Sequence, residues 1–411
     1  MERFLQNTKT SSKLLSILSA AKKRMILEEM ADAIDGYNMV IVEANDIDMK
    51  YAQENNISDA LKDRLMLDSS RVAAMASSIR QISALREPVG RVLDGWHAEA
   101  GFKIEKVSVP IGVIGVIYES RPNVTADVGA LCFKSGNVAI LKGGKEAENS
   151  NRAIAEILQG VLQKHGLPKE TIALLPDSSR EGVASLIKQD KYVDLIIPRG
   201  GEALIRYVCD NATVPVVKHD KGLCHTFIDK DADPDKALAI SLNAKCRRTG
   251  ICGAMETLLV HENIAEMILP KLKTEFEKED TELIGCAKTV EIIDIQKADE
   301  EDWHTEYLDN ILSIKVVADA DEAVEHIAKY GSGHSDAIIT ENHTTAEQFL
   351  NAVDSACVYL NASTQFTDGG EFGFGAEVGI STNKLHARGP MGINELTTYK
   401  YKIYGKAHTR A

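Results

Sequence analysis

The chain has 411 residues, of which 44% are hydrophobic, and a formal net charge of −14. This length exceeds what one compact core usually holds and predicts two or three domains. No stretch gathers Lys and Arg on one face, so we expect no nucleic-acid partner. No apolar run is long enough to cross a bilayer, and residues 1–18 lack the apolar centre of an export signal. We therefore expect a cytoplasmic protein without membrane association, whose seven loosely spaced cysteines are reduced.

The first half of the chain predicts helices, then a ribbon, then alternating strands and helices. Residues 12–33 have helical spacing, and Asp68-Ser69-Ser70 supplies a cap before a second helical run at 72–82. In residues 92–109 the repeat of the apolar pattern shortens to alternating apolar and polar residues, which predicts a β-ribbon. Strands are then expected at 113–117, 138–141, 172–175, 195–197 and 214–217, and helices at 124–134, 150–165, 181–188 and 202–209. This alternation predicts a parallel sheet with helices on both faces.

A second α/β set begins near residue 237. Its helices are expected at 264–278 and 321–329, and its strands at 290–293, 313–317, 336–340 and 357–360. Glycine becomes dense from 369 to 392, which predicts close-packed loop. The tail at 396–403 alternates in the same way as the ribbon at 92–109.

Two turns after predicted strands carry residues suited to phosphate. The first is Lys142-Gly143-Gly144-Lys145, and the second is Pro198-Arg199-Gly200-Gly201, directly before a helix. Glycine lets a ligand approach the backbone, lysine meets phosphate, and free N–H groups at a helix start favour pyrophosphate. Neither turn has the Gly-x-Gly-x-x-Gly spacing, so ordinary strand–helix loops are nearly as good an interpretation.

Cys252 is the cysteine with the most suggestive surroundings. Lys245, Arg247 and Arg248 precede it, and a positive field lowers the pKa of a thiol toward the attacking thiolate. A helix that started near Cys252 would act in the same direction. From these residues alone, a buried small residue is an equally good interpretation.

The segment 218–225 contains His219, Cys224 and His225. A zinc site would need a further ligand, and no second clustered pair is visible, so we expect no metal. A Cys–His hydrolase or acyltransferase that pairs Cys252 with His219 or His225 stays open on spacing alone.

Five blocks along the chain are more specific. The run at 109–123 ends in Glu-Ser-Arg-Pro-Asn, and further blocks lie at 140–147, 194–201, 243–260 and 361–392. Together they resemble the aldehyde dehydrogenase superfamily and, within it, the γ-glutamyl phosphate reductases (glutamate-5-semialdehyde dehydrogenases). The likeness covers essentially the whole chain. The departures are Arg247-Arg248-Thr249 in place of Gln-Arg-Pro, Gly253 in place of Asn, and Gln365 in place of Arg.

The resemblance implies an aldehyde-dehydrogenase-like α/β fold, with two parallel-sheet domains and a small β-ribbon for oligomerisation. It implies a cofactor-binding domain at 1–240, into which the ribbon at 92–109 is inserted, and a catalytic domain with the nucleophilic Cys at 241–383. Residues 384–411 would form a C-terminal return and oligomerisation segment. A homo-oligomer is therefore expected.

The resemblance also implies a reaction, the NADPH-dependent reduction of L-glutamyl 5-phosphate to L-glutamate 5-semialdehyde and phosphate in proline biosynthesis. Cys252 would carry a thioester, while the Asn123 amide and the Cys252 backbone N–H would stabilise the oxyanion. Arg121, Ser363 and Arg388 are the candidate substrate-binding residues. The candidate NADP-binding residues are Lys142, Gly143, Gly144, Lys145, Pro198, Arg199, Gly200 and Gly201.

The direction of the reaction has separate support. Oxidising aldehyde dehydrogenases carry a Glu, upstream of the nucleophile, that activates water. The comparable stretch 217–225 contains no Glu, although Asp220 could substitute. A reductase must keep water from its acyl-enzyme, so the absence favours reduction.

Alternatives remain at this point. They are a CoA-acylating or other aldehyde dehydrogenase, a Cys–His acyltransferase or hydrolase, and a binding protein on the same scaffold without activity. If the reductase interpretation holds, a glutamate 5-kinase is a candidate transient partner, because it would hand over the labile acyl phosphate.

Overall fold

A computed structural model describes residues 1–218 and 221–410. By its internal contacts the chain divides into two compact units. The first comprises Met1–Lys218, Gly373–Gly379 and Met391–Ala411, and the second comprises His219–Phe372 and Ile380–Pro390. No described helix combines the length and hydropathy that a membrane span requires.

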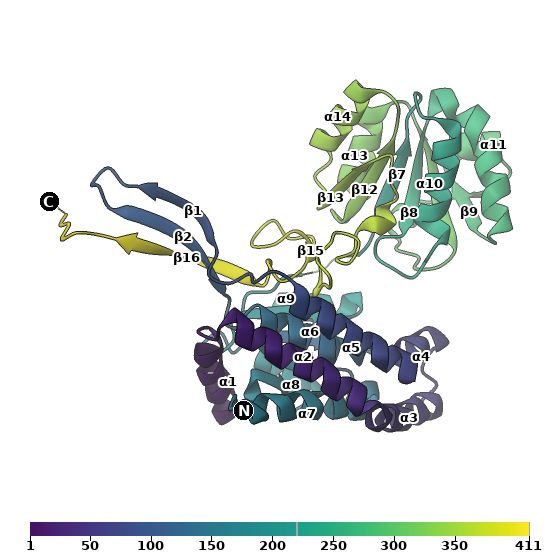
Figure 1. The fold of residues 1–411 in the computed structure, drawn as a ribbon. Coiled ribbons are helices and arrows are strands. Elements are labelled where there is room, and N and C mark those ends of the chain that lie inside the picture. Colours follow the sequence, from purple (N-terminus) through teal and green to yellow (C-terminus); the bar gives the residue numbers. More distant parts are fainter. Residues whose placement is uncertain (219–220, 411) are drawn as a thin grey trace. The chain divides into compact units, whose positions relative to one another are not determined.

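The first unit begins with five helices, labelled in Figure 1. They are α1 (Glu2–Leu15), α2 (Ala20–Gly36), α3 (Asn38–Glu54), α4 (Asp59–Leu65) and α5 (Ser69–Ala84). The expected cap is confirmed, because the Asp68 side chain accepts the Arg71 N–H at 2.8 Å. The helix expected to run continuously through 12–33 is interrupted instead. The Ser19 hydroxyl accepts the Lys22 N–H and starts a new helix there.

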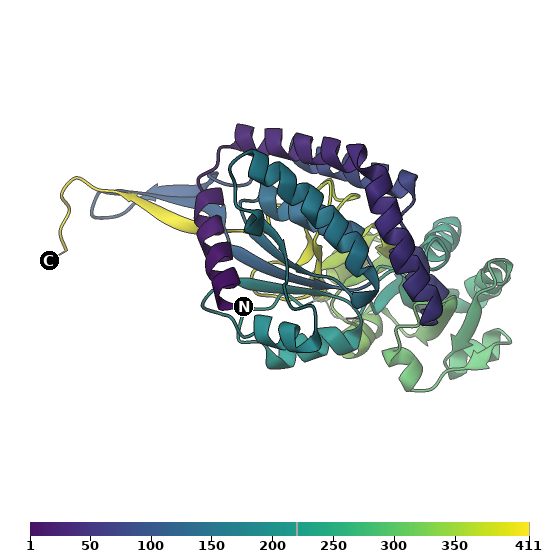
Figure 2. The ribbon, with the colours of Figure 1, turned by 90° about the horizontal axis from the view of Figure 1, so that it is seen from below.

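A four-stranded parallel sheet forms the centre of the first unit, in the order β5-β4-β3-β6. Its strands are β3 (Val113–Tyr118), β4 (Val138–Lys142), β5 (Ile172–Leu174) and β6 (Leu195–Arg199). Between and after them come α6 (Asn123–Lys134), α7 (Glu148–Lys164), α8 (Arg180–Leu186) and α9 (Glu202–Asn211). Helices flank the sheet on both sides (Figure 2). The strand expected at 214–217 is wrong, since only Val216 forms an isolated bridge, to Ile196.

A ribbon projects from this unit. Strands β1 (Val92–His97), β2 (Lys103–Pro110) and β16 (Thr397–Tyr404) form an antiparallel sheet in the order β1-β2-β16 (Figure 1). The alternation at 92–109 and at 396–403 therefore belongs to one sheet, although some 290 residues separate the two segments in sequence. Both strand predictions are confirmed.

The second unit contains a seven-stranded parallel sheet in the order β10-β9-β11-β8-β7-β12-β13. Its bounds are β7 (Cys224–Ile228), β8 (Met255–His261), β9 (Glu282–Gly285), β10 (Gln296–Lys297), β11 (Ile311–Val317), β12 (Ser335–Ile339) and β13 (Cys357–Leu360). The helices are α10 (Pro234–Cys246), α11 (Glu262–Lys278), α12 (Ala287–Ile292), α13 (Ala320–Tyr330) and α14 (His343–Ala352). Because β7 and α10 belong with this sheet, the second unit begins before the division that we expected after residue 240.

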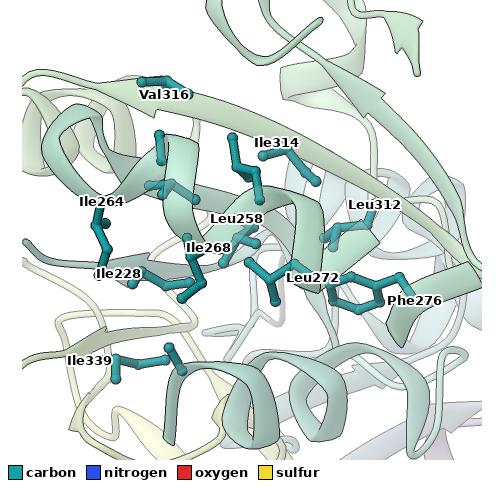
Figure 3. Close-up of a cluster of buried hydrophobic side chains, with 14 of the residues drawn as sticks. Ile228, Leu258, Ile264, Ile268, Leu272, Phe276, Leu312, Ile314, Val316 and Ile339 are labelled. Carbon is teal, nitrogen blue, oxygen red and sulfur yellow. The ribbon is translucent and has the colours of Figure 1, made fainter. Parts of the chain in front are cut away.

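Strand β8 shows how this sheet is covered on both faces. Leu258 and Val260 pack under α11, whose Ile264, Ile268, Leu272 and Phe276 recur every four residues on one helix face (Figure 3). Leu259, between them, points to the opposite face and joins a cluster that includes residues of α13 and α14. The strand expected at 290–293 is wrong, because most of it lies in α12. A short apolar run does not distinguish helix from strand by periodicity.

Candidate active site

The carboxyl ends of β3, β4 and β6 meet at one edge of the first sheet, because these strands are adjacent and parallel. The chain order reverses between β3 and β6, and ligands of open parallel sheets bind at such a switch point. Three loops follow these strands, at 119–122, 143–147 and 200–201. The residues expected to bind a cofactor therefore lie together within this unit.

Two carboxylates tie the three loops to one another. Glu146 Oε1 accepts hydrogen bonds from the Ser120 N–H at 2.7 Å and from the Ser120 hydroxyl at 2.6 Å. Ser120 has φ +40°, a strained value for a residue with a side chain, and these two bonds hold it there. Glu119 Oε2 accepts the Gly201 N–H at 2.9 Å, at the start of α9. The turn that leads into Arg121 and Asn123 is thus fixed by groups outside it.

The helix start at Gly201 behaves as an anion site. Gly201 is the N-cap of α9, and its N–H is met by the Glu119 carboxylate, as a phosphate oxygen would be. Gly200 packs so closely on Glu119 that a Cβ would lie 2.5 Å from Oε2. A phosphate group therefore fits the donors at this turn, provided that the Glu119 side chain moves aside.

The two lysines of the other turn differ in environment. Lys142, at the end of β4, is half-buried, and burial lowers the pKa of its ammonium group, against the opposing effects of Glu146 and Glu119. Lys145 is exposed, with Nζ 5.8 Å from the ring centroid of Tyr51. Gly143, between them, has no room for a side chain, because a Cβ would overlap the Asn151 amide. Two cationic groups thus flank a backbone to which a ligand can come close.

Asn123 is the first residue of α6, directly after this strained turn. Its amide Nδ2 donates to Asp127 Oδ2 at 3.1 Å, one helical turn away. Arg121 precedes it and is half-buried, and its carbonyl accepts the Val124 N–H. The fold therefore presents Asn123 at a helix N-terminus, where the partial positive charge favours a developing oxyanion.

Cys252 belongs to the second unit, in the segment between α10 and β8. Residues 247–254 form bends and turns, so the helix that we considered at Cys252 is not there. The thiol-bearing residue is partly exposed. It lies at the amino ends of β7 and β8, because Cys224, the first residue of β7, pairs with Met255, the first of β8.

Three contacts hold this loop. The Cys224 thiol donates to the Cys252 carbonyl at 3.1 Å, and the Thr364 hydroxyl donates to the Gly253 carbonyl at 2.7 Å. Gly222 packs on the Cys252 backbone so tightly that any Cβ there would overlap it. The Gly222 N–H in turn donates to Glu306 Oε1 at 2.8 Å. A nucleophile needs this kind of fixed backbone, because its own N–H has to point at the oxyanion.

Two of the three basic residues before Cys252, Lys245 and Arg247, are engaged elsewhere. Lys245 Nζ lies 2.6 Å from Glu256 Oε2 in an ion pair that is almost fully buried. Arg247 Nε donates to Gln365 Oε1 at 2.9 Å, and Gln365 Nε2 donates to the Ala244 carbonyl. The expected positive field from three basic side chains is therefore reduced, because Glu256 neutralises the charge of Lys245.

The hydrolase alternative needs His219 or His225 as the partner of Cys252. His225 Nδ1 lies 2.9 Å from Asp336 Oδ1, and its ring packs against His326. The His225 side chain contacts Asp336 and His326, whereas the Cys224 thiol touches the Cys252 loop. His225 is thus a poor partner for Cys252. His219 and Asp220 lie outside the described residues. Among the residues that the structure describes, no three His, Cys, Asp or Glu side chains gather as a metal site requires.

The two expected substrate contacts of this unit already have partners. Ser363 is buried, and its hydroxyl accepts the Gln365 N–H at the start of a 3-10 turn, Thr364–Phe366. Arg388 Nη1 lies 2.8 Å from Asp354 Oδ1, and Nη2 donates to the Asp354 carbonyl. Its Nε is buried and has no hydrogen-bond partner among the described residues. Arg388 thus resembles a structural anchor more than a free carboxylate receptor.

The sequence did not predict the contacts of Asp127 and Glu306, or the hydrogen bonds by which Glu119 and Glu146 link the loops. All four are acidic residues in or beside predicted helices and loops, where a carboxylate usually faces solvent. Only the motif that contains Glu119, Glu-Ser at 119–120, gave a signal, and it predicted a turn but not the hydrogen bond to Gly201.

Comparison with known proteins agrees with this architecture. The sequence model of the aldehyde dehydrogenase family matches residues 1–282, and the chain belongs to this family. The fold also matches the crystal structure of an acetylating aldehyde dehydrogenase from Geobacillus thermoglucosidasius, with a TM-score of 0.71 at 17% identity over 100% of this chain and 97% of that one. The aldehyde dehydrogenase family uses a nicotinamide cofactor.

Relatives with much higher sequence identity belong to one group within this family. The chain is 66% identical over 410 residues, the whole of both chains, to a γ-glutamyl phosphate reductase from Sulfurimonas denitrificans, and 67% identical over 411 residues to one from Nitratiruptor. A crystal structure of γ-glutamyl phosphate reductase from Thermotoga maritima superposes with a TM-score of 0.98 at 45% identity, covering 100% of this chain and 99% of that one.

Proposed function

We propose that the chain catalyses the NADPH-dependent reduction of L-glutamyl 5-phosphate to L-glutamate 5-semialdehyde and phosphate, as a step of proline biosynthesis. The observation that carries the proposal is the full-length identity of about two thirds to proteins named γ-glutamyl phosphate reductase.

The residues of this chain divide the work as follows. The Cys252 thiolate attacks the acyl carbon, and phosphate leaves, which forms a thioester on Cys252. The negative charge on the acyl oxygen is met by the Asn123 amide and the Cys252 backbone N–H, a contribution of roughly 3 kcal/mol per donor. A bound NADPH supplies the hydride that reduces this thioester. The hemithioacetal then releases the aldehyde and returns the thiolate.

The cofactor choice rests on the edge of the first sheet. The Gly201 N–H at the start of α9 suits the pyrophosphate, with Pro198, Arg199 and Gly200 leading into it. Lys142 and Lys145, around Gly143 and Gly144, suit the additional phosphate of NADPH. Arg121, Ser363 and Arg388 stay candidates for the substrate, and the existing Asp354 contacts make Arg388 the weakest of the three.

The ribbon supports a homo-oligomer. Val92, Leu93, Trp96, Tyr399, Tyr401, Ile403 and Tyr404 are exposed on it. Strands β1 and β16 end the three-stranded sheet on either side, so each offers an edge to another strand. We place the protein in the cytoplasm, where a transient contact with glutamate 5-kinase would protect the labile acyl phosphate.

One assay tests the reaction. The purified chain is given glutamate 5-semialdehyde, inorganic phosphate and NADP⁺, and the absorbance of reduced nicotinamide is followed. The proposal expects cofactor reduction that requires phosphate. Turnover that requires CoA instead would identify an acylating aldehyde dehydrogenase, and no cofactor reduction at all would overturn the redox proposal.

A further inference from the structure

Glu146 lies in the loop that carries the candidate cofactor lysines, yet its carboxylate bonds the turn that leads to Asn123. Its Oε1 accepts the Ser120 N–H at 2.7 Å and the Ser120 hydroxyl at 2.6 Å. The two loops follow β3 and β4, which are neighbours in the sheet, with Ile117 opposite Lys142. Glu146 therefore links two loops whose bonded residues are 26 positions apart in sequence.

Ser120 has a backbone conformation that requires support. It is buried, and its φ of +40° strains any residue that has a Cβ. The two hydrogen bonds to Glu146 offset that strain. The carboxylate reaches Ser120 because Gly144 leaves room for it, since a Cβ at Gly144 would overlap Glu146 Oε1. Gly144 and Glu146 thus act together on the conformation of Ser120.

The backbone at Ser120 sets the direction in which α6 begins. Only Arg121 and Pro122 separate Ser120 from Asn123, the first residue of that helix. Pro122 has φ −61°, which its ring fixes, and a proline also restricts the residue before it. A change at Ser120 is therefore passed on to Asn123, because the two residues between them have little freedom to absorb it. All of these residues belong to the first unit.

We propose that Glu146 is a positioning residue, which fixes Ser120 and thereby holds the Asn123 amide in place for the oxyanion. The inference rests on the proposed function, because it takes Asn123 as the oxyanion donor. It assigns different work to residues of one loop. Lys142 and Lys145 serve the cofactor, whereas Glu146 serves the steps in which charge develops on the acyl oxygen.

A role of Glu146 in the cofactor site predicts a different outcome. Burial lowers the pKa of the Lys142 ammonium, and the charge of Glu146 opposes that shift. If support of Lys142 were its main contribution, loss of Glu146 would weaken NADP⁺ binding and leave kcat nearly unchanged. If Glu146 positions Asn123, its loss lowers kcat and leaves the affinity for NADP⁺ unchanged.

The experiment measures two quantities in Glu146→Ala and Glu146→Gln. They are kcat for glutamate 5-semialdehyde with phosphate and NADP⁺, and the dissociation constant for NADP⁺. Glu148→Ala is the matched control, because it removes the same charge two residues further on, where the carboxylate bonds the exposed Arg152. We expect this control to keep the kcat of the unmodified chain.

We expect kcat to fall by about 10- to 100-fold in Glu146→Ala, as the loss of hydrogen bonds to a charged group implies. The NADP⁺ dissociation constant should not change. Glu146→Gln should stay close to the unmodified chain, because the amide Oε1 still accepts from both Ser120 groups. An unchanged kcat in Glu146→Ala, or a loss carried by NADP⁺ affinity, overturns the inference.

A double variant shows whether the effect passes through Asn123. In Asn123→Ala there is no amide left to position, so the addition of Glu146→Ala should lower kcat little further. A loss as large as in the unmodified background overturns the inference.

Urea denaturation checks that the variants fold, which we expect because the Tyr118 and Thr125 hydroxyls, 2.7 Å apart, also tie α6 to the sheet. Ser120→Ala removes one of the two bonds to Glu146, and it repeats the comparison if Glu146→Ala does not fold. The absence of phosphate-dependent turnover in the unmodified chain would refute the proposed function instead.

Discussion

Lys245 Nζ and Glu256 Oε2 lie 2.6 Å apart, with side-chain exposures of only 0% and 1%, on the two sides of the loop that carries Cys252. Glu256 Oε1 also accepts the Leu308 N–H at 3.2 Å. Desolvation raises the pKa of Glu256 to about 7, against the attraction of Lys245. The ion pair thus anchors both ends of the nucleophile segment in the core of the second unit.

Removing one partner of this pair should destabilise the protein. Lys245→Met leaves a buried carboxyl without its cation, and we expect a loss of about 3–5 kcal/mol in the free energy of unfolding. The double variant Lys245→Met with Glu256→Gln should recover much of that loss, because no charge stays buried. Urea denaturation, followed by fluorescence, measures both. Equal stabilities for the single variant and the unmodified protein would contradict this role of the pair.

Cys252→Ala should lower phosphate-dependent turnover by at least about 10³-fold, because no thioester can form. Its affinity for NADP⁺, measured by fluorescence titration, should not change, since Cys252 is not among the candidate cofactor-binding residues. Cys286→Ala is the control, because that thiol is also partly exposed and contacts the Thr289 hydroxyl. Substantial activity in Cys252→Ala would assign the nucleophile to another residue.

For Asn123→Ala we expect kcat to fall by about 10²- to 10³-fold, the usual effect of removing one oxyanion donor. The dissociation constant for NADP⁺ should stay the same, since the Asn123 amide bonds Asp127 and none of the cofactor loops. Steady-state kinetics and a binding titration separate the two effects. An unchanged kcat would remove Asn123 from the oxyanion role.

Arg247 and Gln365 form a hydrogen-bonded pair in which the two residue types should be exchangeable. Gln365→Ala leaves the Ala244 carbonyl and Arg247 Nε without this partner, at a cost of about 1–3 kcal/mol. In the double variant Arg247→Gln with Gln365→Arg, an arginine and a glutamine still face each other. We expect its loss in the free energy of unfolding to be smaller than the summed losses of the single variants Arg247→Gln and Gln365→Arg, by about 0.5–3 kcal/mol. Additive effects in thermal unfolding would show that the pair is not coupled.

His326 predicts an acid-sensitive second unit. Burial, together with His225, Lys315 and Lys329, lowers the pKa of His326 to about 2. In the unfolded chain the imidazole takes a proton near pH 6.5. Its contribution to stability is therefore complete above that pH, and it is lost as the pH falls toward 2, at up to about 1.4 kcal/mol per pH unit.

His326→Phe tests this contribution. Phenylalanine keeps an aromatic ring against Trp303 and Tyr330 but does not titrate. We expect the Tm of this variant to fall less than that of the unmodified protein between pH 7 and pH 5. Parallel Tm curves over this range would mean that His326 does not set the acid sensitivity.

Local patterns were reliable where one property decides the structure. Alternation predicted β1, β2 and β16, and the Asp68 cap located the start of α5. They failed where two signals compete. Residues 290–293 are rich in β-branched side chains, yet most of them close a short helix, because Thr289 and its neighbours pack under the strand that ends at Val317.

The sequence by itself determined the α/β class and, through the family motifs, Cys252 and Asn123 as candidate site residues, because a motif depends only on the order of residues along the chain. Only the tertiary structure decided which charges act on them. Lys245 looked like an activator of Cys252 and is instead neutralised by Glu256, eleven residues later. Asp127 carries no sequence signal of its own, and in the fold its carboxylate accepts the Asn123 amide N–H. The strength of such charge interactions depends on burial, and burial is set by the packing of elements that are far apart in the sequence.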